Sequence, residues 1–197
     1  MANSTTKQEK RDGRGAGKRE RLVEGARAVL YAQGVERTTL AEIAEAADVP
    51  VGNVYYYFKT KDELVEAVVA SHLDEVRGAL KALEVHRTPK ARLKAFVRLL
   101  IQQADLMAAH GCPQGSLCSE LDKRDAGSAR QRSELLGAPI DWAEQQFRAM
   151  GRRDARDLAV ALIASYQGIA LITQSFGDPE LVVREGKRLE RWIDSLG

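Results

Sequence analysis

The stretch that most constrains the fold of this chain covers residues 38–64, TTLAEIAEAADVPVGNVYYYFKTKDEL. Thr39 and Glu42 have the spacing of a capping box, in which the two side chains bind free backbone N–H groups at the start of a helix. Apolar residues then recur at helical spacing until residues 48–50 interrupt them. The pattern predicts two short helices joined by a tight turn, the second over about 51–57.

Two short helices joined in this way are typical of a helix-turn-helix, whose second helix enters the major groove of DNA. Ala44 is small where the two helices approach each other, and Val49 is apolar where the turn packs back. The turn position that is most often glycine holds Asp48, and aspartate tolerates a left-handed backbone better than most residues. A second capping box, Thr60 and Glu63, predicts that a third helix follows at once.

These residues also carry a family resemblance. The motif T-T-L-A-E-I-A, followed by V-Y-Y-Y-F-K-T-K-D-E-L, closely resembles the DNA-binding domain of TetR/AcrR-family transcriptional regulators over about residues 19–70. Residues 19–33 form an amphipathic helical pattern that Gly34 ends, so the DNA-binding module has three helices. The resemblance implies operator contacts at the positions of Thr39, Asn53, Tyr55, Tyr56 and Lys61.

The residue types support DNA contact independently of the resemblance. Asn53 can pair with an adenine edge, Tyr56 can reach a phosphate or a thymine methyl group, and Gly52 lets the backbone approach DNA. Thr39 and Lys61 begin flanking helices, where hydroxyl, ammonium and backbone N–H groups bind phosphate. For Tyr55, contact and packing remain equally open. The predicted DNA-binding residues are Thr39, Val51, Gly52, Asn53, Tyr55, Tyr56, Tyr57 and Lys61.

Charge and composition divide the chain into three segments. The net charge is +2, and its excess lies before residue 63, where 11 Lys and Arg face 9 Asp and Glu. Residues 1–17 are polar and Gly-rich, which predicts a disordered arm that either touches DNA or is simply solvated. We expect the DNA-binding domain over 18–64 and a ligand-binding and dimerisation domain over 65–197.

The rest of the chain has helical periodicity throughout. We therefore predict an all-α fold with about nine helices, one of them continuous from Thr88-Pro89 to Gly111. Gly137 and Pro139 should kink or break the helix over 128–150. We find no run of eighteen apolar residues, so we expect no membrane span and, with only two cysteines, a bacterial cytoplasmic protein located at the nucleoid.

The family resemblance implies a homodimer that binds a palindromic operator through double-stranded DNA contacts and, by default, represses transcription. Small residues on the penultimate helix and apolar ones on the last suit such an interface, at Ala161, Ala164, Ser165, Gly168, Leu189, Trp192 and Ile193. The resemblance also implies a pocket for a small effector. A mostly apolar lining favours a lipophilic or aromatic molecule, held by Phe96, Leu100, Gln103, Met107, Leu117, Leu121, Trp142, Phe147, Tyr166 and Gln167, although each also suits ordinary core packing.

The stretch from Gly111 to Leu121, G-C-x-x-G-x-L-x-x-E-L, looks like part of the LmrA/YxaF-like subgroup of the family. Relatives with a cysteine at the position of Cys112 include sensors of oxidants or electrophiles, and the alternative role is a small buried side chain. We expect Cys118 to be the more buried cysteine. The spacing of His110, Cys112 and Cys118 matches no zinc site. No phosphate loop, nucleophile motif or cofactor motif indicates an enzyme, and the remote alternative is a helical interaction module that binds no DNA.

Overall fold

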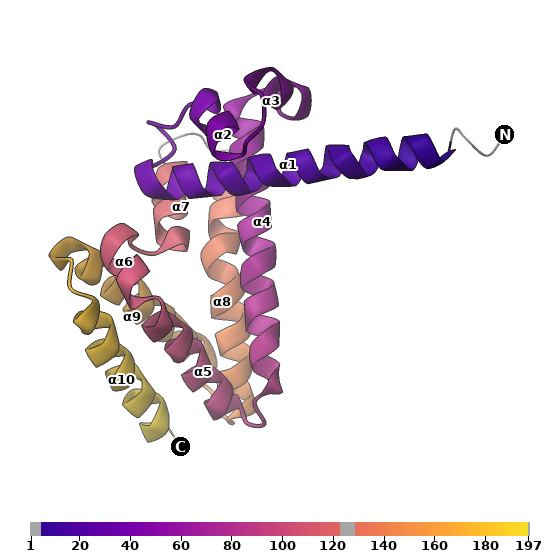
Figure 1. Cartoon of the computed structure of the whole chain (residues 1–197). Coiled ribbons are helices and arrows are strands. Elements are labelled where there is room, and N and C mark those ends of the chain that lie inside the picture. Colours follow the sequence, from indigo (N-terminus) through magenta and orange to yellow (C-terminus); the bar gives the residue numbers. More distant parts are fainter. Residues whose placement is uncertain (1–4, 123–128, 197) are drawn as a thin grey trace. The chain divides into compact units, whose positions relative to one another are not determined.

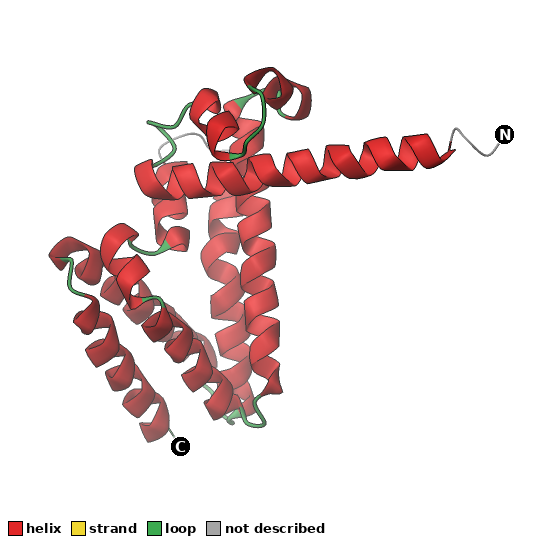
Figure 2. Ribbon diagram, in the orientation of Figure 1, coloured by secondary structure: helices red, strands yellow, loops and turns green. Residues whose placement is uncertain are grey.

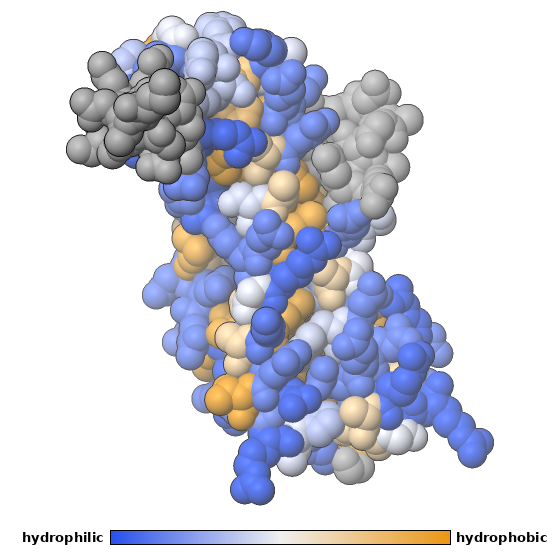
Figure 3. Space-filling model, turned by 90° about the vertical axis from the view of Figure 1, so that its right-hand side faces the viewer, coloured by the Kyte–Doolittle hydropathy of each residue, from blue (hydrophilic) through white to orange (hydrophobic). Residues whose placement is uncertain are grey.

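The computed structural model describes residues 5–122 and 129–196, with side chains for residues 17–120 and 133–196. All regular secondary structure in those ranges is helical, as Figures 1 and 2 show, which confirms the all-α prediction. The chain forms two compact units, one up to His72 and one from Leu73 onward. On the face drawn in Figure 3, hydrophilic residues cover most of the surface, as expected for helices whose apolar stripes face inward.

The first unit contains α1 (Thr5–Gln33), α2 (Leu40–Ala46), α3 (Val51–Tyr57) and the beginning of α4 (Lys61–Ala82). Helix α2 packs against both α1 and α3. Each helix contributes apolar side chains that are removed from solvent, namely Leu22, Ala26, Ile43, Ala44, Val54 and Leu64. This small core holds the predicted helix-turn-helix together.

Helix α1 is longer than predicted. The disordered arm over residues 1–17 is wrong from Thr5 onward, because α1 begins there and continues through residue 17 to Gln33. The segment is rich in Lys, Arg, Glu and Gln, which are good helix formers, and extending an existing helix costs far less free energy than starting one. Residues 1–4 lie outside the described residues.

The second unit contains the rest of α4, the 3₁₀ turn η1 (Leu83–Val85) and six further α-helices. These helices are α5 (Pro89–Gln102), α6 (Ala104–His110), α7 (Pro113–Asp122), α8 (Ala129–Ala149), α9 (Ala155–Phe176) and α10 (Pro179–Ser195). Helix α8 packs along α9, and α10 packs along α5. Their shared core includes Leu93, Leu100, Phe147, Leu162 and Ile193.

The predicted helix from residue 88 to Gly111 is divided in two. Gln103 leaves the helical conformation (φ −102°, ψ 16°), so α5 ends at Gln102 and α6 begins at Ala104. Apolar periodicity continues across the break, since Leu100 and Met107 are both fully buried. A sequence pattern that runs on uninterrupted therefore hides a change of direction in the backbone, and the described part of the chain has ten α-helices.

The expected break in α8 does not occur, because α8 runs through Pro139. Proline lacks the N–H that would donate to the Leu135 carbonyl one turn earlier. The Gln114 side chain of α7 points its Nε2 at that carbonyl oxygen at 3.5 Å. A neighbouring helix thus provides a donor that the proline cannot.

The predicted helix start at Thr88-Pro89 is confirmed, because the Thr88 side chain accepts from the Ala91 N–H. The Asp178 side chain caps α10 in the same way by accepting from the Glu180 N–H, and a proline comes next in both helices. Asp154 precedes α9 without capping it, because both of its carboxylate oxygens bind the Arg152 guanidinium at 3.0 Å. This hydrogen-bonded pairing lowers the pKa of Asp154.

Helix α9 changes one expectation about membranes. Among the described residues it is the one helix long and apolar enough, with a mean hydropathy of 1.4, to meet the requirement for a membrane span. One face of α9 carries Leu162 and Thr173, which are fully buried in the core of the second unit. Core helices of soluble proteins share this composition, so length and hydropathy are weak evidence for a span.

Candidate nucleic-acid interface

The turn between α2 and α3 has the geometry that the sequence predicts. Asp48 adopts a left-handed conformation with φ 50°. The Val49 N–H donates to the Ala44 carbonyl at 2.9 Å and the Asp48 N–H to the Glu45 carbonyl at 3.0 Å, which is the Schellman arrangement at a helix end. The turn therefore ends α2 and starts α3 within four residues.

An arginine that sequence reasoning missed supports this turn from α1. Arg21 Nη1 lies 3.4 Å from the Asp48 carbonyl oxygen and 3.6 Å from its carboxylate. Only a short polar side chain in the left-handed position can offer both groups to one guanidinium. Asp48 is thus suited to the turn by its side chain as well as by its backbone tolerance.

The contact between α1 and α2 depends on a glycine that was also missed. A Cβ atom at Gly25 would lie 2.9 Å from the backbone nitrogen of Ala47. Backbone atoms cannot move aside as a flexible side chain can, so the close approach of the two helices requires glycine at this position. A glycine in the middle of a helical pattern was the available signal.

The capping box at the start of α2 is confirmed. The Thr39 Oγ1 accepts from the Glu42 N–H at 3.3 Å, and the Glu42 carboxylate accepts from the Thr39 N–H at 2.8 Å. The Thr39 N–H bond is the main cause of a lowered pKa at Glu42, followed by bonds from the Thr39 and Gln33 side chains. At α4 the second box differs, because Glu63 accepts from the Lys59 N–H while Thr60 accepts from the Glu63 N–H.

Helix α3 presents an aromatic surface to solvent. Tyr56 is 75 % exposed and Tyr55 is 53 % exposed, whereas Val54 and Phe58 are buried beneath them. Large aromatic side chains that are exposed on a short helix keep apolar surface in water and add nothing to the core. Such side chains mark interaction surfaces. The exposure of Tyr55 favours contact over packing for the residue that the sequence left open.

The other predicted contact residues lie around these tyrosines. Val51, Gly52 and Thr39 are exposed, while Asn53, Tyr57 and Lys61 are partly buried. Tyr57 packs edge-on against Tyr56, with ring centroids 4.9 Å apart. The Lys61 ammonium donates to the Glu36 carbonyl at 3.3 Å, so it lies at the edge of the module beside the loop that precedes α2. All eight residues belong to the first unit.

The predicted effector pocket has a different outcome. Leu100, Met107, Leu117, Trp142 and Phe147 are buried in the core, and Phe96 packs between Trp142 and Tyr166 with ring centroids 5.7 Å apart. Gln103 is exposed, Gln167 contacts Cys112, and the Leu121 side chain is outside the described residues. The burial of these five core side chains favours ordinary packing as their role. A groove of about 650 Å³ lies instead between α4 and α8 and shares only Trp142 with the predicted set.

The predicted dimer residues fall into two groups. Ala161, Ser165, Gly168, Leu189 and Trp192 line a groove of about 520 Å³ between α9 and α10, and Ala164 is exposed beside it. Ile193 is 0 % exposed and belongs to the core of its own chain, so its inclusion in an interface is wrong. The helical spacing of the last helix does not distinguish a core face from an adjoining interface face.

The two cysteines have the opposite order of burial to the one expected. Cys112 is buried at 6 % exposure, whereas Cys118 is only partly buried. Cys112 precedes α7, its carbonyl accepts from Ser116, and Gln167 of α9 donates to its sulfur at 3.5 Å. Gly115 leaves room for the same glutamine, whose Oε1 would lie 2.6 Å from an added Cβ. These contacts explain the glycine in the motif by packing.

Comparison with known proteins agrees with this geometry. Residues 22–68 match the family of bacterial regulatory proteins described as the tetR family. The chain is 28 % identical over 189 residues to the HTH-type transcriptional regulator TtgR of Pseudomonas putida, covering 90 % of this chain and 88 % of that one. It is 34 % identical over 131 residues to the HTH-type transcriptional regulator RutR of Escherichia coli, covering 61 % and 58 %.

Solved structures share the fold of most of the chain. A TetR transcriptional regulator from Chloroflexus aurantiacus superposes with a TM-score of 0.81 at 22 % identity, covering 92 % of this chain and 96 % of that one. A TetR-family regulator from Agrobacterium tumefaciens gives 0.80 at 18 % identity, covering 90 % and 97 %.

The fold and the exposed α3 surface define a helix-turn-helix DNA-binding transcriptional regulator. The matched domain places residues 22–68 in the TetR family, and the relatives and solved regulators extend the similarity over most of the chain. Its likeness to the LmrA/YxaF-like subgroup remains a prediction.

Proposed function

We propose that this protein is a homodimeric, ligand-responsive repressor that binds a palindromic operator through α3. The observation that supports this most directly is the exposure of Tyr55 and Tyr56 above the buried Val54 and Phe58. The short helix is held rigidly from below and has adaptable hydrogen-bonding groups above, as recognition of base edges and phosphates requires. A cytoplasmic location follows from this role.

The proposed contacts divide by their chemistry. Asn53 and Tyr56 on α3 read bases, and Val51, Gly52, Tyr55 and Tyr57 complete the surface against the groove. Thr39 and Lys61 bind phosphates. In the free protein Thr39 Oγ1 and Lys61 Nζ lie 2.8 Å from the Glu42 carboxylate and 3.3 Å from the Glu36 carbonyl, so each group exchanges a protein partner for a phosphate on binding.

Dimerisation is proposed through α9 and α10. Ser165, Gly168 and Trp192 line the groove between these helices. Further along α9, the apolar residues Leu171 and Ile172 are 65 % and 50 % exposed. A second copy related by twofold symmetry would cover this face and place two recognition helices on half-sites about one turn of DNA apart.

We propose an effector because of the family resemblance. Binding of the effector would release the protein from DNA, so the protein would act as a sensor. A lipophilic effector within the predicted set would have to displace the packed side chains of Leu100, Met107 and Phe147.

A second candidate is electrophile sensing through Cys112, which one contact favours. The Gln167 amide of α9 donates to Cys112 Sγ at 3.5 Å, so a polar group contacts the sulfur that an electrophile would modify. After treatment with an electrophile, the wild type should then lose operator binding, whereas Cys112→Ser should keep it. Without treatment, the two proteins should bind the operator equally. An unchanged response would exclude this candidate.

Selection of bound sequences from a random DNA pool tests the main proposal. We expect an enriched inverted repeat with the wild-type protein and none with Tyr56→Ala. Enrichment of a sequence without twofold symmetry would contradict the proposed dimer, and no enrichment would contradict DNA recognition by α3.

The selected operator then separates the two kinds of contact. Asn53→Ala should relax preference at one base pair and cost about 1–3 kcal/mol on the preferred sequence. Lys61→Ala should weaken binding to all sequences and reduce the slope of log K against log salt by about one. Competition binding over a range of salt concentrations measures both. The assignment of roles fails if Lys61→Ala changes base preference.

A further inference from the structure

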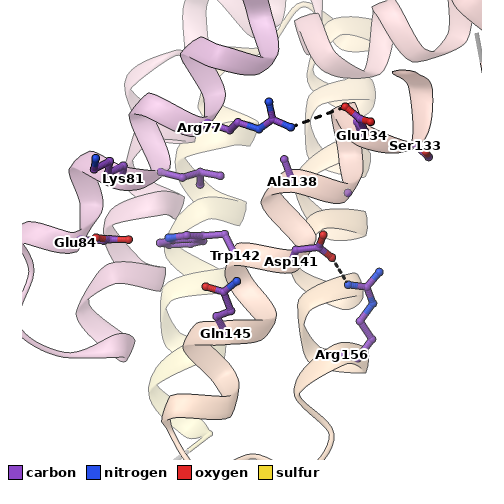
Figure 4. Close-up of a pocket in the computed structure, with 12 residues that line it drawn as sticks. Arg77, Lys81, Glu84, Ser133, Glu134, Ala138, Asp141, Trp142, Gln145 and Arg156 are labelled. Carbon is purple, nitrogen blue, oxygen red and sulfur yellow. Dashed lines mark hydrogen bonds and ion pairs between the residues drawn. The ribbon is translucent and has the colours of Figure 1, made fainter. Parts of the chain in front are cut away.

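A groove between α4 and α8 carries groups that the proposed function does not use. It has a volume of about 650 Å³, and Figure 4 shows its charged residues arranged along both walls. Arg77, Lys81 and Glu84 come from the α4 side, and Glu134 and Asp141 from α8. Arg156 of α9 adds a third cation, so that three cationic and three anionic side chains line the groove.

Four of these six charges are already neutralised within the protein. Arg77 pairs with Glu134, and Arg156 pairs with Asp141, as the dashed lines in Figure 4 indicate. Bonding to Asp141 and then Glu144 raises the pKa of Arg156. Within the described part of the chain, the Lys81 ammonium and the Glu84 carboxylate have no such partner. One positive and one negative group therefore remain available in the groove.

A buried donor faces the same groove. Trp142 is 8 % exposed, and its Nε1 has no hydrogen-bond partner among the described residues. Figure 4 shows the side chain extending from α8 toward the α4 side of the groove, at the level of Glu84. A buried N–H without an acceptor costs free energy, so this position favours an occupant that carries an acceptor oxygen.

The two sides of this site are linked by a chain of hydrogen bonds. Arg92 of α5 donates to the carbonyl oxygens of Glu84 and His86 and to the Gln146 side chain. Gln146 in turn donates to the Trp142 carbonyl at 3.4 Å. Glu84 and Trp142 are thus linked through protein groups, which pre-organises them toward a ligand.

Uncharged residues also line the groove. Leu80, Gly137 and Ala138 line it, and a Cβ atom at Gly137 would meet nothing within 4 Å. A flat apolar group can occupy that space. An uncharged lipophilic molecule would offer no partner to the Lys81 ammonium or the Glu84 carboxylate, and it would displace water from any part of them that it covers.

We propose that the groove between α4 and α8 binds a small zwitterion with a flat apolar centre. Its carboxylate binds the Lys81 ammonium and the Trp142 indole N–H, and its ammonium group binds the Glu84 carboxylate. The inference rests on the proposed function, because it assumes that an effector regulates the protein. It assigns that effector one positive and one negative charge in place of a lipophilic character.

Nuclear magnetic resonance of the full-length ¹⁵N-labelled protein tests the proposal without DNA. The chain has two tryptophans, so Trp142 and Trp192 give two indole N–H signals that Trp192→Phe assigns. The probe is 4-(aminomethyl)benzoate, compared with benzoate and benzylamine, which each carry one of its charges. We expect a saturable downfield shift of the Trp142 signal with the zwitterion, no shift at Trp192, and about tenfold weaker binding of either single ion.

Variants show whether the groove is the site. Lys81→Ala and Glu84→Ala should each weaken probe binding about tenfold, whereas Lys187→Ala, an exposed position on α10, should not. Gly137→Phe should block the groove and abolish the shift. If Gly137→Phe does not fold, the Lys81 and Glu84 variants still test the site, because both residues are exposed.

Three outcomes would overturn the proposal: no saturable shift up to about 10 mM probe, equal binding of all three compounds, or an undiminished shift in the Lys81 and Glu84 variants. Failure of operator binding would contradict the proposed function and would leave this titration unaffected.

Discussion

At the scale of single residues, the left-handed turn at Asp48 combines two roles. Its φ of 50° is unfavourable for any residue with a Cβ, and its carbonyl and carboxylate both face Arg21. The ion pair is fully solvated on the aspartate side, so it contributes little to stability. The backbone conformation therefore dominates the effect of a substitution.

We expect Asp48→Gly to be at least as stable as the wild type, because glycine removes the left-handed strain. Asp48→Ala keeps the strain and loses the polar side chain, and it should lower the free energy of unfolding by about 1 kcal/mol relative to Asp48→Gly. Urea denaturation of the full-length protein measures the difference. Equal stability of the two variants would show that backbone strain at this position is negligible.

At the scale of secondary-structure elements, two helical glycines make a matched pair. Gly25 in α1 lies against the backbone of Ala47, whereas a Cβ at Gly78 in α4 would meet nothing within 4 Å. In both helices alanine has the better intrinsic propensity. Gly25 is buried and has a neighbouring backbone in the way of a Cβ atom, whereas Gly78 is exposed and has none.

Gly78→Ala should raise the free energy of unfolding by about 0.5–1 kcal/mol through helix propensity. Gly25→Ala should lower it by about 1–3 kcal/mol, since the added methyl group separates α1 from α2. Gly25→Ala should also weaken operator binding, because α2 positions α3. Thermal denaturation together with the operator assay measures both. Stabilisation by Gly25→Ala would contradict the close approach of the helices.

The pair α5 and α10 is joined by ion pairs that the sequence analysis did not foresee. Lys94 Nζ binds the Asp194 carboxylate at 2.7 Å, and Arg98 binds Glu190 at the same distance. The spacing of four residues on each helix puts these charges on facing sides. Hydrogen bonding from Lys94 lowers the pKa of Asp194 below its ordinary value of 3.8.

A lowered carboxyl pKa stabilises the fold above the unfolded-state value, and this stabilisation is lost as the pH falls through the lower folded-state value. Asp194→Asn should therefore reduce the melting temperature at pH 7, and the difference from wild type should shrink as the pH falls below about 3.8, the ordinary pKa of an aspartate. Melting curves of both proteins between pH 2.5 and 7 at low salt, about 20 mM, provide the measurement. A difference that persists at the acid end would mean that the amide disturbs packing instead.

At the scale of the whole molecule, the proposed assembly depends on the outward face of α9 and α10. That face combines small residues with exposed apolar ones, including Leu171 and Phe176, while the opposite face of α9 is core. A monomer would leave this surface in water, and such patches mark protein interfaces.

Ser165→Arg places a long charged side chain in the groove between α9 and α10 and should convert the dimer to a monomer of the 21.7 kDa chain mass. Operator affinity should fall with it, because one recognition helix makes too few contacts. Ser119→Arg, at an exposed position on α7, is the matched control and should leave the assembly unchanged. Sedimentation equilibrium measures the mass. A dimeric Ser165→Arg variant would place the interface elsewhere.

The features that the sequence predicts correctly are those that depend on neighbouring residues. The capping box at Thr39, the left-handed turn at Asp48 and the start of α5 at Thr88-Pro89 are each determined by hydrogen bonds or dihedral angles within a few residues. The all-α fold follows similarly from helical periodicity. The DNA-binding residues were predicted from motif and residue type, and the exposure of Tyr55 and Tyr56 on α3 suits that prediction without testing it.

Tertiary packing decides the rest, because it depends on residues far apart in the chain. The break at Gln103, the donor that Gln114 offers near Pro139 and the burial of Ile193 arise where one helix meets another. Apolar periodicity specifies which side of a helix avoids water, and it is the same for a filled core, a ligand pocket and a subunit interface. Only the folded arrangement shows that Leu100 and Phe147 fill the core while Lys81, Glu84 and Trp142 surround a groove.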